Sequence, residues 1–538
     1  MSKNSYRKAH HVILKKTAPF IILLLCFCLA GCNSCGDTKS WSDYLFPVIG
    51  DVNLAQDAPW PMWQHDPSHT GRSPFNGPTS VTAATYDTPL CCFGIFGSPV
   101  IDAGSHVFVG SIRSAGDTLT CDFFANPEEG ASGLLHGIDY DGAVLEGFPY
   151  DSHRGSVMAT AIECAPIILD DGSVIFGKDD GYMYRVGNDG SLVWESPSDD
   201  PFDSSDPVND NEQMIPSPLL GADNTVVFLS HFSDVYGPGP TADAVAFACP
   251  DLDPFPFKGT ASQWYSKIYA LDARTGWRKW VFDPEDDPAS GGQPMVGWGS
   301  PALGPDGSYI ICLMHAQLAG DHYVPTTGRV FAIGPDGSRR WVYPAEGEGP
   351  LDYSLWTSPV ISPSGYIYVG ASDYTYTTKV ARLYSLTPEG ALRWYYDFTD
   401  ENTIAASPSL LSDGTIIVAT QNRSTALPSL PAGKYGRIYA LTDYGDHADE
   451  QWRYPAAGTV PWGFYSSPLV DASGHIYIAS EPFSFGGAET GVLIGLESDG
   501  DLMFSVALDG VVHGNLALGS DGALVVPQRK SPRLLVFY

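Results

Sequence analysis

Positive charge is scarce in this chain of 538 residues. Lysine and arginine number 29 against 62 aspartates and glutamates, which gives a formal net charge of −33 at pH 7. Such a surface repels the phosphates of nucleic acids and of anionic lipids, so neither is expected as a partner. An acidic exterior that keeps the folded chain in solution accounts for the balance. Local cation binding at Asp203–Glu212 is the alternative, although the stretch lacks EF-hand spacing.

Short catalytic motifs are missing as well. The chain has no Gly-x-Ser-x-Gly turn, no His-Glu-x-x-His helix, no Gly-Lys-Ser/Thr phosphate loop and no paired Cys-x-x-Cys zinc site. Its histidines are dispersed, which is typical of structural or exposed residues. The sequence therefore assigns no catalytic residue, no cofactor-binding residue and no metal ligand.

Long amphipathic helix patterns are also lacking, and turn residues are abundant instead. Glycine occurs 57 times, proline 43 times, and aromatic residues make up 12% of the chain. This composition is typical of many short strands joined by tight turns. A length of 538 residues would suggest several domains, but architectures built from repeats escape that rule.

Residues 1–31 form a separate segment. A basic stretch precedes the apolar run Phe20–Ala30, which is too short to span a bilayer stably. The run leads into Gly31-Cys32, and Leu29 to Cys32 resembles a bacterial lipobox. The resemblance implies cleavage before Cys32 and a lipid on that cysteine, hence an anchor without a membrane span. A plain signal peptide is the alternative. Asn33 favours sorting to the outer membrane, on its periplasmic side or at the cell surface.

One pattern recurs eight times after the N-terminal region. Each copy opens with a short apolar strand, which usually follows a Ser-Pro pair, and continues through an Asp-Gly-like turn into a second strand. Proline is tolerated at a strand start because no ladder hydrogen bond is lost there. A third and a fourth strand complete a four-stranded antiparallel blade. The eight openings are Ser98-Pro99, Ala165-Pro166, Ser217-Pro218, Ser300-Pro301, Ser358-Pro359, Ser407-Pro408, Ser467-Pro468 and the degenerate Gly514-Asn515.

The third and fourth strands of several copies carry a large aromatic residue at a fixed offset from a turn glycine, and one further copy is stretched. The fullest copy is Ala270–Trp280, with Ala270, Asp272, Thr275, Gly276 and Trp280 at its key positions. It resembles the tryptophan-docking motif of the PQQ-like, quinoprotein-type β-propeller repeat family. The resemblance implies that these residues join neighbouring blades. Partial copies end at Trp194, Trp341, Trp394, Trp452 and Phe504.

The ends of the chain predict how the ring closes. The last copy has only three strands, while Val81–Tyr86 stands before the first copy without a blade of its own. Three C-terminal strands plus this N-terminal outer strand would close the ring and remove its open edges. The sequence thus predicts an all-β, single eight-bladed propeller. Its expected organisation is residues 1–31 as signal peptide, 32–58 as a flexible tether and 59–538 as the propeller. A lead-in, Trp60–Ser73, precedes the first blade.

Insertions concentrate on one face of the expected ring. The turns between first and second and between third and fourth strands are short, and these define the smooth face. The connections between second and third strands and between blades hold nearly all extra residues, and these define the decorated face. His231–Tyr265 and His315–Thr327 are examples of long loops there, whereas Lys178–Gly181 is short. A ligand site is expected on the decorated face because loops carry binding while the scaffold positions them.

Aromatic residues precede several inner strands at this face. Phe96, Trp298, Trp356 and Tyr465 each stand three residues before the proline, and Trp462 is close by. Aromatic rings that converge on an axial opening can form a stacking platform for a planar cofactor, a glycan or a peptide. Ordinary packing across the channel mouth is the alternative interpretation.

Cysteines near blades one to three offer a second candidate feature. The resemblance to quinoprotein alcohol dehydrogenases implies that the neighbours Cys91 and Cys92 could form a vicinal disulfide. Loop staples that involve Cys92, Cys121 or Cys164 are the alternative, and sequence alone cannot choose. The same resemblance allows a PQQ- and calcium-dependent alcohol or sugar dehydrogenase. No local motif supplies its calcium ligands, base and arginine.

Together these features favour a non-catalytic, lipid-anchored envelope propeller that is monomeric and binds a protein or a glycan through its decorated face. No cofactor is expected under this interpretation. Repeat type, lipobox and blade number also resemble the propeller lipoprotein of the outer-membrane β-barrel assembly machinery, which implies a role in outer-membrane protein assembly.

Overall fold

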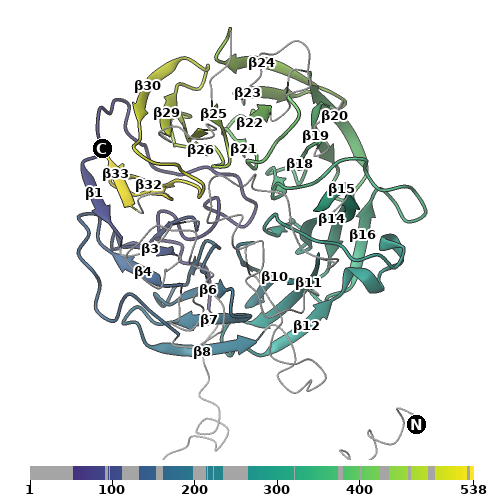
Figure 1. The fold of residues 1–538 in the computed structure, drawn as a ribbon, viewed down its shortest axis with the longest axis horizontal. Coiled ribbons are helices and arrows are strands. Elements are labelled where there is room, and N and C mark those ends of the chain that lie inside the picture. Colours follow the sequence, from purple (N-terminus) through teal and green to yellow (C-terminus); the bar gives the residue numbers. More distant parts are fainter. Residues whose placement is uncertain are drawn as a thin grey trace, which may run out of the picture. The chain divides into compact units, whose positions relative to one another are not determined.

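Short apolar strands separated by tight turns form antiparallel sheets around a central axis (Figure 1). The computed structural model describes residues 52–90, 95, 97–111, 133–152, 161–197, 214, 216–221, 223–233, 264–319, 322–373, 380–399, 401–422, 435–457, 462–482, 491–529 and 533–538. All of these belong to one unit, which clusters from Asp51 to Tyr538. None of the described helices is long and apolar enough to span a membrane.

The blades follow one another in chain order, each with its first strand nearest the axis. Blade 1 contains β2 (Val100–Ile101), β3 (Val107–Gly110) and β4 (Leu135–Ile138). Blade 2 contains β5 (Ile167–Ile168), β6 (Val174–Lys178), β7 (Tyr182–Val186) and β8 (Leu192–Pro197). Blade 3 contains β9 (Leu219–Leu220), β10 (Thr225–Ser233), β11 (Trp264–Asp272) and β12 (Arg278–Phe282). Blade 4 contains β13 (Ala302–Leu303), β14 (Tyr309–Ala319), β15 (His322–Ile333) and β16 (Arg339–Tyr343).

The second half of the ring repeats this arrangement. Blade 5 contains β17 (Val360–Ile361), β18 (Ile367–Ala371), β19 (Ala381–Leu386) and β20 (Leu392–Phe398). Blade 6 contains β21 (Ser409–Leu410), β22 (Ile416–Asn422), β23 (Tyr435–Asp443) and β24 (Ala448–Tyr454). Blade 7 contains β26 (Leu469–Val470), β27 (Ile476–Ala479), β29 (Val492–Leu496) and β30 (Leu502–Ala507). Blade 8 contains β31 (Ala517–Leu518), β32 (Leu524–Gln528) and β33 (Arg533–Phe537).

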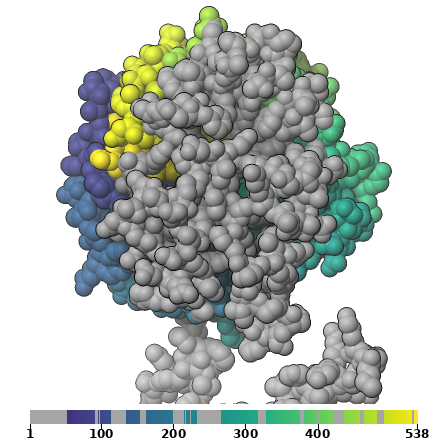
Figure 2. All heavy atoms as spheres, viewed as in Figure 1, coloured from purple at the N-terminus to yellow at the C-terminus, as the bar shows by residue number. Residues whose placement is uncertain are grey.

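The N-terminal strand β1 (Tyr86–Pro89) completes blade 8 beside β33, so the predicted eight-bladed fold and its three-plus-one closure are confirmed. The purple N-terminal strand and the yellow C-terminal strands lie side by side in Figure 2. The pairing starts later than the expected Val81–Tyr86. The amide of Thr85 donates to the Val536 carbonyl, and Arg533 pairs with Asp87 at 2.6 Å. Val81 is instead buried in the core cluster of blades 7, 8 and 1.

Three further details differ from the expected outline. In blade 1 the outer position is taken by isolated bridges, Leu135 with Tyr150 and Ile138 with Val144, and this copy also lacks the docking tryptophan. The expected loop His315–Thr327 is largely a continuation of the β14–β15 hairpin. Short elements also occur between blades: η3 (Pro284–Asp286), η4 (Pro288–Ser290), and the pair β25 (Trp462–Gly463) and β28 (Glu481–Pro482).

The lead-in closes the smooth end of the central channel. Its carbonyl oxygens accept hydrogen bonds from the last residue of the inner strand in six blades. These bonds join Trp60 to Ile101, Pro61 to Ile168, Pro67 to Leu303, Ser68 to Ile361, Thr70 to Leu410 and Gly71 to Val470, at 2.8 to 2.9 Å. The packing already begins at Val52, whose amide donates to the Asn224 side chain at 2.6 Å, so residues 52–58 are not part of a free tether.

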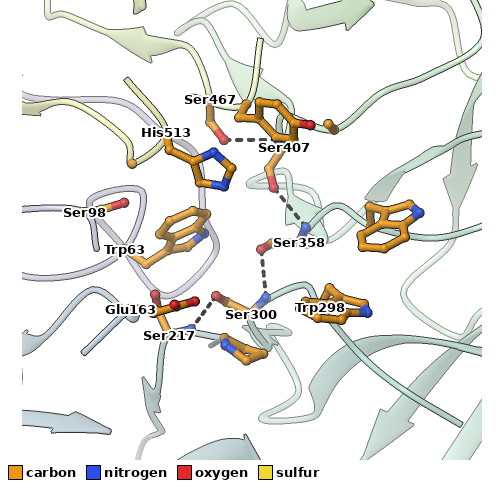
Figure 3. Close-up of a pocket in the computed structure, with 15 residues that line it drawn as sticks. Trp63, Ser98, Glu163, Ser217, Trp298, Ser300, Ser358, Ser407, Ser467 and His513 are labelled. Carbon is orange, nitrogen blue, oxygen red and sulfur yellow. Dashed lines mark hydrogen bonds between the residues drawn. The ribbon is translucent and has the colours of Figure 1, made fainter. Parts of the chain in front are cut away.

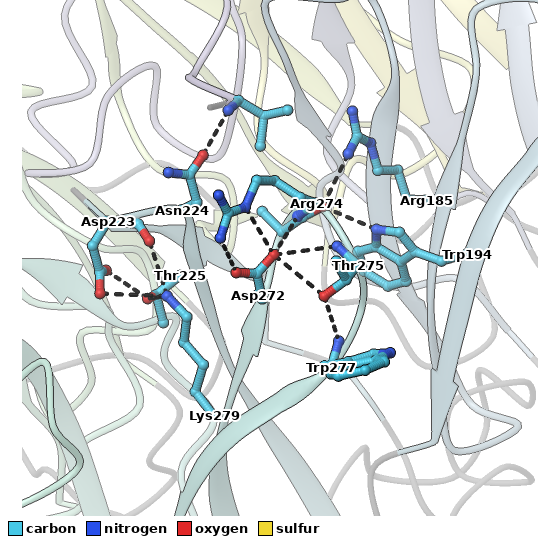
Figure 4. Close-up of polar contacts among 12 residues, drawn as sticks. Arg185, Trp194, Asp223, Asn224, Thr225, Asp272, Arg274, Thr275, Trp277 and Lys279 are labelled. Atoms are coloured by element: carbon cyan, nitrogen blue, oxygen red, sulfur yellow. Dashed lines mark hydrogen bonds and ion pairs between the residues drawn. The ribbon is translucent and has the colours of Figure 1, made fainter. Parts of the chain in front are cut away.

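Neighbouring blades are joined on the smooth face by the docking motif. The Trp194 indole donates to the carbonyl of Ala273 at 2.9 Å, within the Ala270–Trp280 hairpin of the next blade (Figure 4). In the same hairpin the Asp272 carboxylate accepts bonds from the amides of Arg274 and Thr275. Gly276 has a φ of 72°, and a Cβ there would lie 2.9 Å from the Trp194 ring. Only glycine therefore fits this turn.

Trp280 makes the corresponding contact one blade further on. Its indole donates to the Pro335 carbonyl at 2.8 Å, and a Cβ on Gly337 would lie 2.8 Å from its ring. The same relation holds for Trp341 with Pro388 and for Trp452 with Ser498. The repeated glycine-to-tryptophan offset of the sequence thus corresponds to a repeated contact between blades.

Candidate functional site

An axial cavity with a volume of about 170 Å³ lies between the lead-in and the decorated face (Figure 3). Trp63 contributes from the lead-in, and the remaining lining residues come from the starts of inner strands. Because the backbone of the lead-in bonds to six blades at the smooth end, the cavity is positioned to open towards the decorated face. Binding cavities in ring-shaped scaffolds commonly occupy such axial positions.

The mouth of the cavity is built by one structural position of each blade, three residues before the strand-opening proline or its equivalent. Aromatic side chains occupy this position in Trp298, Trp356 and Tyr465, as the sequence predicts. The same position holds Glu163, Ala405 and His513, which also line the cavity. Sequence reasoning missed these residues because it searched for aromatic side chains, although the spacing alone would have found them.

The aromatic side chains form two groups around the mouth. Trp298 and Trp356 stack with ring centroids 5.5 Å apart, and His231 meets Trp298 edge-on at 4.9 Å. Tyr465 stacks on His513 at 4.6 Å. These four lining rings, like the Trp63 ring of the lead-in, are half-buried. The geometry therefore combines packing within each group with a surface that faces the cavity.

A ring of hydrogen bonds between blades surrounds the cavity below the mouth. In each case the backbone N–H of one blade donates to the side-chain oxygen of the serine or asparagine that opens the next blade (Figure 3). The donor–acceptor pairs are Ala165–Ser217, Ser217–Ser300, Ser300–Ser358, Ser358–Ser407, Ser407–Ser467, Ser467–Asn515 and Asn515–Ser98, at 2.7 to 3.0 Å. This contact explains the serine of the Ser-Pro repeat.

The ring is interrupted between blades 1 and 2, because blade 2 opens with Ala165 in place of a serine. Glu163 lies two residues earlier and lines the cavity beside this gap. Burial raises the pKa of Glu163 to about 7, against the opposing attraction of Arg529. Burial also raises the pKa of the neighbouring Asp179 well above its usual range, and the charge of Glu163 adds to that shift.

Blade 2 adds a buried polar group next to Asp179. Lys178 is 1% exposed, donates to the Ser152 hydroxyl at 2.7 Å and lies 3.7 Å from Asp180. Burial lowers the pKa of Lys178 and raises that of Asp180, and the mutual attraction of the two groups opposes both shifts. Lys178, Asp179 and Asp180 lie at the end of β6 and in the short connection that follows it, so these buried charged groups belong to blade 2.

Several candidates from the sequence lie elsewhere. The side chains of Phe96 and Trp462, and the whole of Cys91, Cys92 and Cys121, fall outside the described residues. Cys164 is a buried thiol that exchanges hydrogen bonds with the backbone of Gly177 at 3.3 and 3.4 Å, so a staple that ends at Cys164 is not formed in this structure. Cys32 precedes the described part of the chain.

The lining residues do not fit a calcium-bound quinone. Among the described residues that line the cavity, Glu163 is the one carboxylate, and no arginine or asparagine accompanies it. Within the described ranges, no three histidine, cysteine or acidic residues gather as a metal site would require. Calcium prefers six or more oxygen ligands, which this wall does not offer. No step of a quinoprotein reaction follows from these residues.

Solved structures of other proteins align with much of this chain, and the Dos1 propeller among them supports the propeller fold. The propeller of Dos1 aligns with 86% of this chain and 96% of its own, at 9% identity and a TM-score of 0.50. Hydrazine synthase of Kuenenia stuttgartiensis aligns with 68% of this chain and 92% of its own, at 11% identity and a TM-score of 0.40. A Bacteroides caccae protein of unknown function aligns with 62% and 93%, at 11% identity and a TM-score of 0.31.

The class of protein defined by the fold is an eight-bladed β-propeller. At 9% identity the likeness to the Dos1 propeller extends to the fold alone. No family model and no curated protein matches the sequence. The function must therefore be argued from the axial cavity.

Proposed function

We propose that this chain is a non-catalytic, exported binding protein whose axial cavity takes a saccharide at the decorated face. One observation carries the proposal. In six blades, the residue three positions before the strand-opening proline or its equivalent lines one cavity of about 170 Å³, and the stacked pair Trp298 and Trp356 forms part of its wall. Indole faces take the apolar C–H face of a sugar ring, while hydroxyls below can bind its polar edge.

The saccharide proposal is tested by intrinsic tryptophan fluorescence with glucose, galactose, N-acetylglucosamine and their disaccharides as probes. We expect at least one of these sugars to change the emission, and the double substitution Trp298→Ala, Trp356→Ala to abolish the change. Trp277→Ala is the matched control, because Trp277 is 72% exposed on an outer hairpin. Unchanged sugar binding by the double variant overturns the proposal.

A protein partner, including one in outer-membrane protein assembly, is the other outcome of the same test. It is supported if none of the sugars binds while cross-linking in the cell envelope captures a partner through the wild-type mouth and not through the double variant. Propeller scaffolds need no cofactor for stability, so neither outcome requires one.

The lipid anchor on Cys32 belongs to the same proposal, and the lipobox-like sequence supports it. Cells that express the full chain and are fed labelled palmitate should label the wild type, and Cys32→Ala should lose the label and leave the membrane fraction. The neighbouring substitution Cys35→Ala is the control and should keep both. A labelled Cys32→Ala variant would contradict the anchor.

A further inference from the structure

We propose that the axial cavity selects sugars that carry a carboxylate, because hydroxyl and N–H donors in and beside its described walls have no acceptor in the protein. The inference rests on the proposed saccharide site and names the class of sugar that the site takes. It is argued from the hydrogen bonds that the cavity walls have already formed and from those that they have left open.

The serine ring leaves its own hydroxyl protons available. Each of the six serine oxygens accepts an N–H from the preceding blade, and each hydroxyl keeps its proton to donate and one further lone pair. Within the described part of the chain, none of these hydroxyls donates a hydrogen bond to a protein acceptor. The six are Ser98, Ser217, Ser300, Ser358, Ser407 and Ser467, and all of them line the cavity.

Two further buried donors have no hydrogen-bond partner among the described residues: one on Trp63, which lines the cavity, and one on Asn515, which follows the lining residue Gly514. The Asn515 side-chain oxygen accepts the amide of Ser467 at 2.7 Å, and this bond fixes which end of the amide is the NH₂ group. Among the described residues, neither this NH₂ group nor the indole N–H of Trp63 has an acceptor, and both groups are buried. Asn515 is 3% exposed, so its NH₂ group is shielded from bulk water. A buried donor without an acceptor costs free energy, which a ligand acceptor would recover.

A carboxylate is the ligand group that fits such a wall. It has two oxygens with about four lone pairs and donates nothing when ionised, so it accepts from several hydroxyls and amides at once. Charge-assisted hydrogen bonds of this kind are about twice as strong as neutral ones. A sugar ring held at Trp298 and Trp356 could direct a carboxylate substituent to the serine ring, because both sets of residues line one cavity.

Glu163 is the group in the wall that opposes a carboxylate ligand. Burial raises its pKa to about 7, so it is largely neutral in mildly acidic solution and charged in alkaline solution. The other titratable and charged groups described around it are Asp179, Arg529, Cys164 and, in the same cavity lining, His513. Affinity for an anionic sugar should therefore fall as the pH rises through about 7, since an ionised Glu163 repels it.

The test compares matched sugars, glucuronate with glucose and galacturonate with galactose, by calorimetry. We expect each uronate to bind about tenfold more tightly than its neutral partner in mild acid. Asn515→Asp keeps the acceptor for Ser467 and replaces the free NH₂ group by an oxygen, so it should reduce the ratio of the two affinities to about one. Trp63→Phe removes the other free donor and should reduce the ratio in part.

The pH dependence supplies a second readout. In the wild type, the ratio of uronate affinity to neutral-sugar affinity should fall as the pH rises through about 7. In Glu163→Gln this ratio should change less with pH. Trp277→Ala is the control and should leave both affinities unchanged. Neutral sugars that bind as tightly as uronates overturn the inference and leave the saccharide proposal standing. Absence of binding by every sugar overturns both. If a peptide binds and loses its binding when its C-terminus is amidated, the carboxylate ligand is a peptide C-terminus and the uronate inference is overturned.

Discussion

The two ends of the axial channel are built from different kinds of interaction. At the smooth end the backbone of the lead-in bonds to six inner strands, and the docking tryptophans pack on the turn glycines of the next blade. At the decorated end side chains dominate: half-buried aromatic rings, the serine ring and Glu163. At the smooth end, backbone hydrogen bonds and close-packed turns leave few groups that could contact a ligand. At the decorated end, side chains have hydrogen-bond donors without an acceptor in the protein. We infer that the smooth end stabilises the ring and the decorated end binds.

The docking tryptophan gives the largest expected effect on the smooth end. Trp280→Ala removes a half-buried ring and its bond to Pro335, which should lower the free energy of unfolding by about 3 kcal/mol. Chemical denaturation measures this change. Trp277→Ala, three residues away and 72% exposed, should change it by less than about 0.5 kcal/mol. A folded Trp280→Ala variant that loses ligand binding without losing stability would contradict the inference that the smooth end stabilises the ring and the decorated end binds.

The lead-in gives the next largest effect. The Asp66 carboxylate accepts bonds from the amides of Ser68 and Thr70 at 2.9 and 3.3 Å and from the Thr70 hydroxyl. Asp66→Ala should therefore cost about 2 kcal/mol of stability, and Asp66→Asn, which keeps an acceptor, should cost less. Sugar binding by the folded fraction should stay the same if the lead-in acts as a structural closure.

The protonation of Asp66 gives the same contact a pH dependence. Burial alone would raise its pKa, but the nearby His65 ring, 3.7 Å away, and the bonds from Thr70 outweigh burial and hold the pKa below 3.8. A carboxylate with a depressed pKa contributes stability above the pKa of the unfolded chain and loses it as the pH falls through the folded value. The difference in stability between wild type and Asp66→Asn should therefore shrink below a pH of about 3.8. A difference that is constant with pH would contradict the ionised contact.

The interrupted serine ring gives the smallest effect and connects the two ends. Ala165→Ser supplies an oxygen for the amide of Ser98 and should raise the stability by about 1 kcal/mol, whereas Ser300→Ala removes an existing bond and should lower it by about 1 kcal/mol. Thermal unfolding of the two variants measures both changes. Equal destabilisation by both would show that the gap at blade 2 is required by packing around Glu163.

The sequence predicts the parts of the fold that depend on particular side chains better than the parts that depend on backbone hydrogen bonds. The Ser-Pro pairs and the glycine-to-tryptophan offsets predicted eight blades because each signal recurs at a fixed spacing. The closing strand was placed four residues or so too early, since β1 is mostly exposed and its register depends on backbone bonds to β33. The course of the lead-in was not predictable for the same reason: its bonds go to backbone amides that leave no trace in the sequence.

The candidate site was predictable in part. The offset of three residues before the proline correctly brought Trp298, Trp356 and Tyr465 to one cavity. Glu163 and His513 occupy the same offset before the inner strand, but they are not among the residue types expected in a stacking platform. The pattern of Phe, Trp and Tyr residues therefore did not include them. The gap in the serine ring became meaningful only when the hydrogen bonds between blades were known, because Ala165 looks like an ordinary variant of the Ser-Pro pair.

Saturation-transfer NMR on galacturonate and galactose tests the central claim most directly, since it detects contact between the protein and the sugar protons. The account predicts transfer to galacturonate that is retained in folded Trp280→Ala and lost in the double variant Trp298→Ala, Trp356→Ala. Transfer that survives in the double variant, or that disappears in folded Trp280→Ala, would contradict the assignment of binding to the decorated end and of stability to the smooth end.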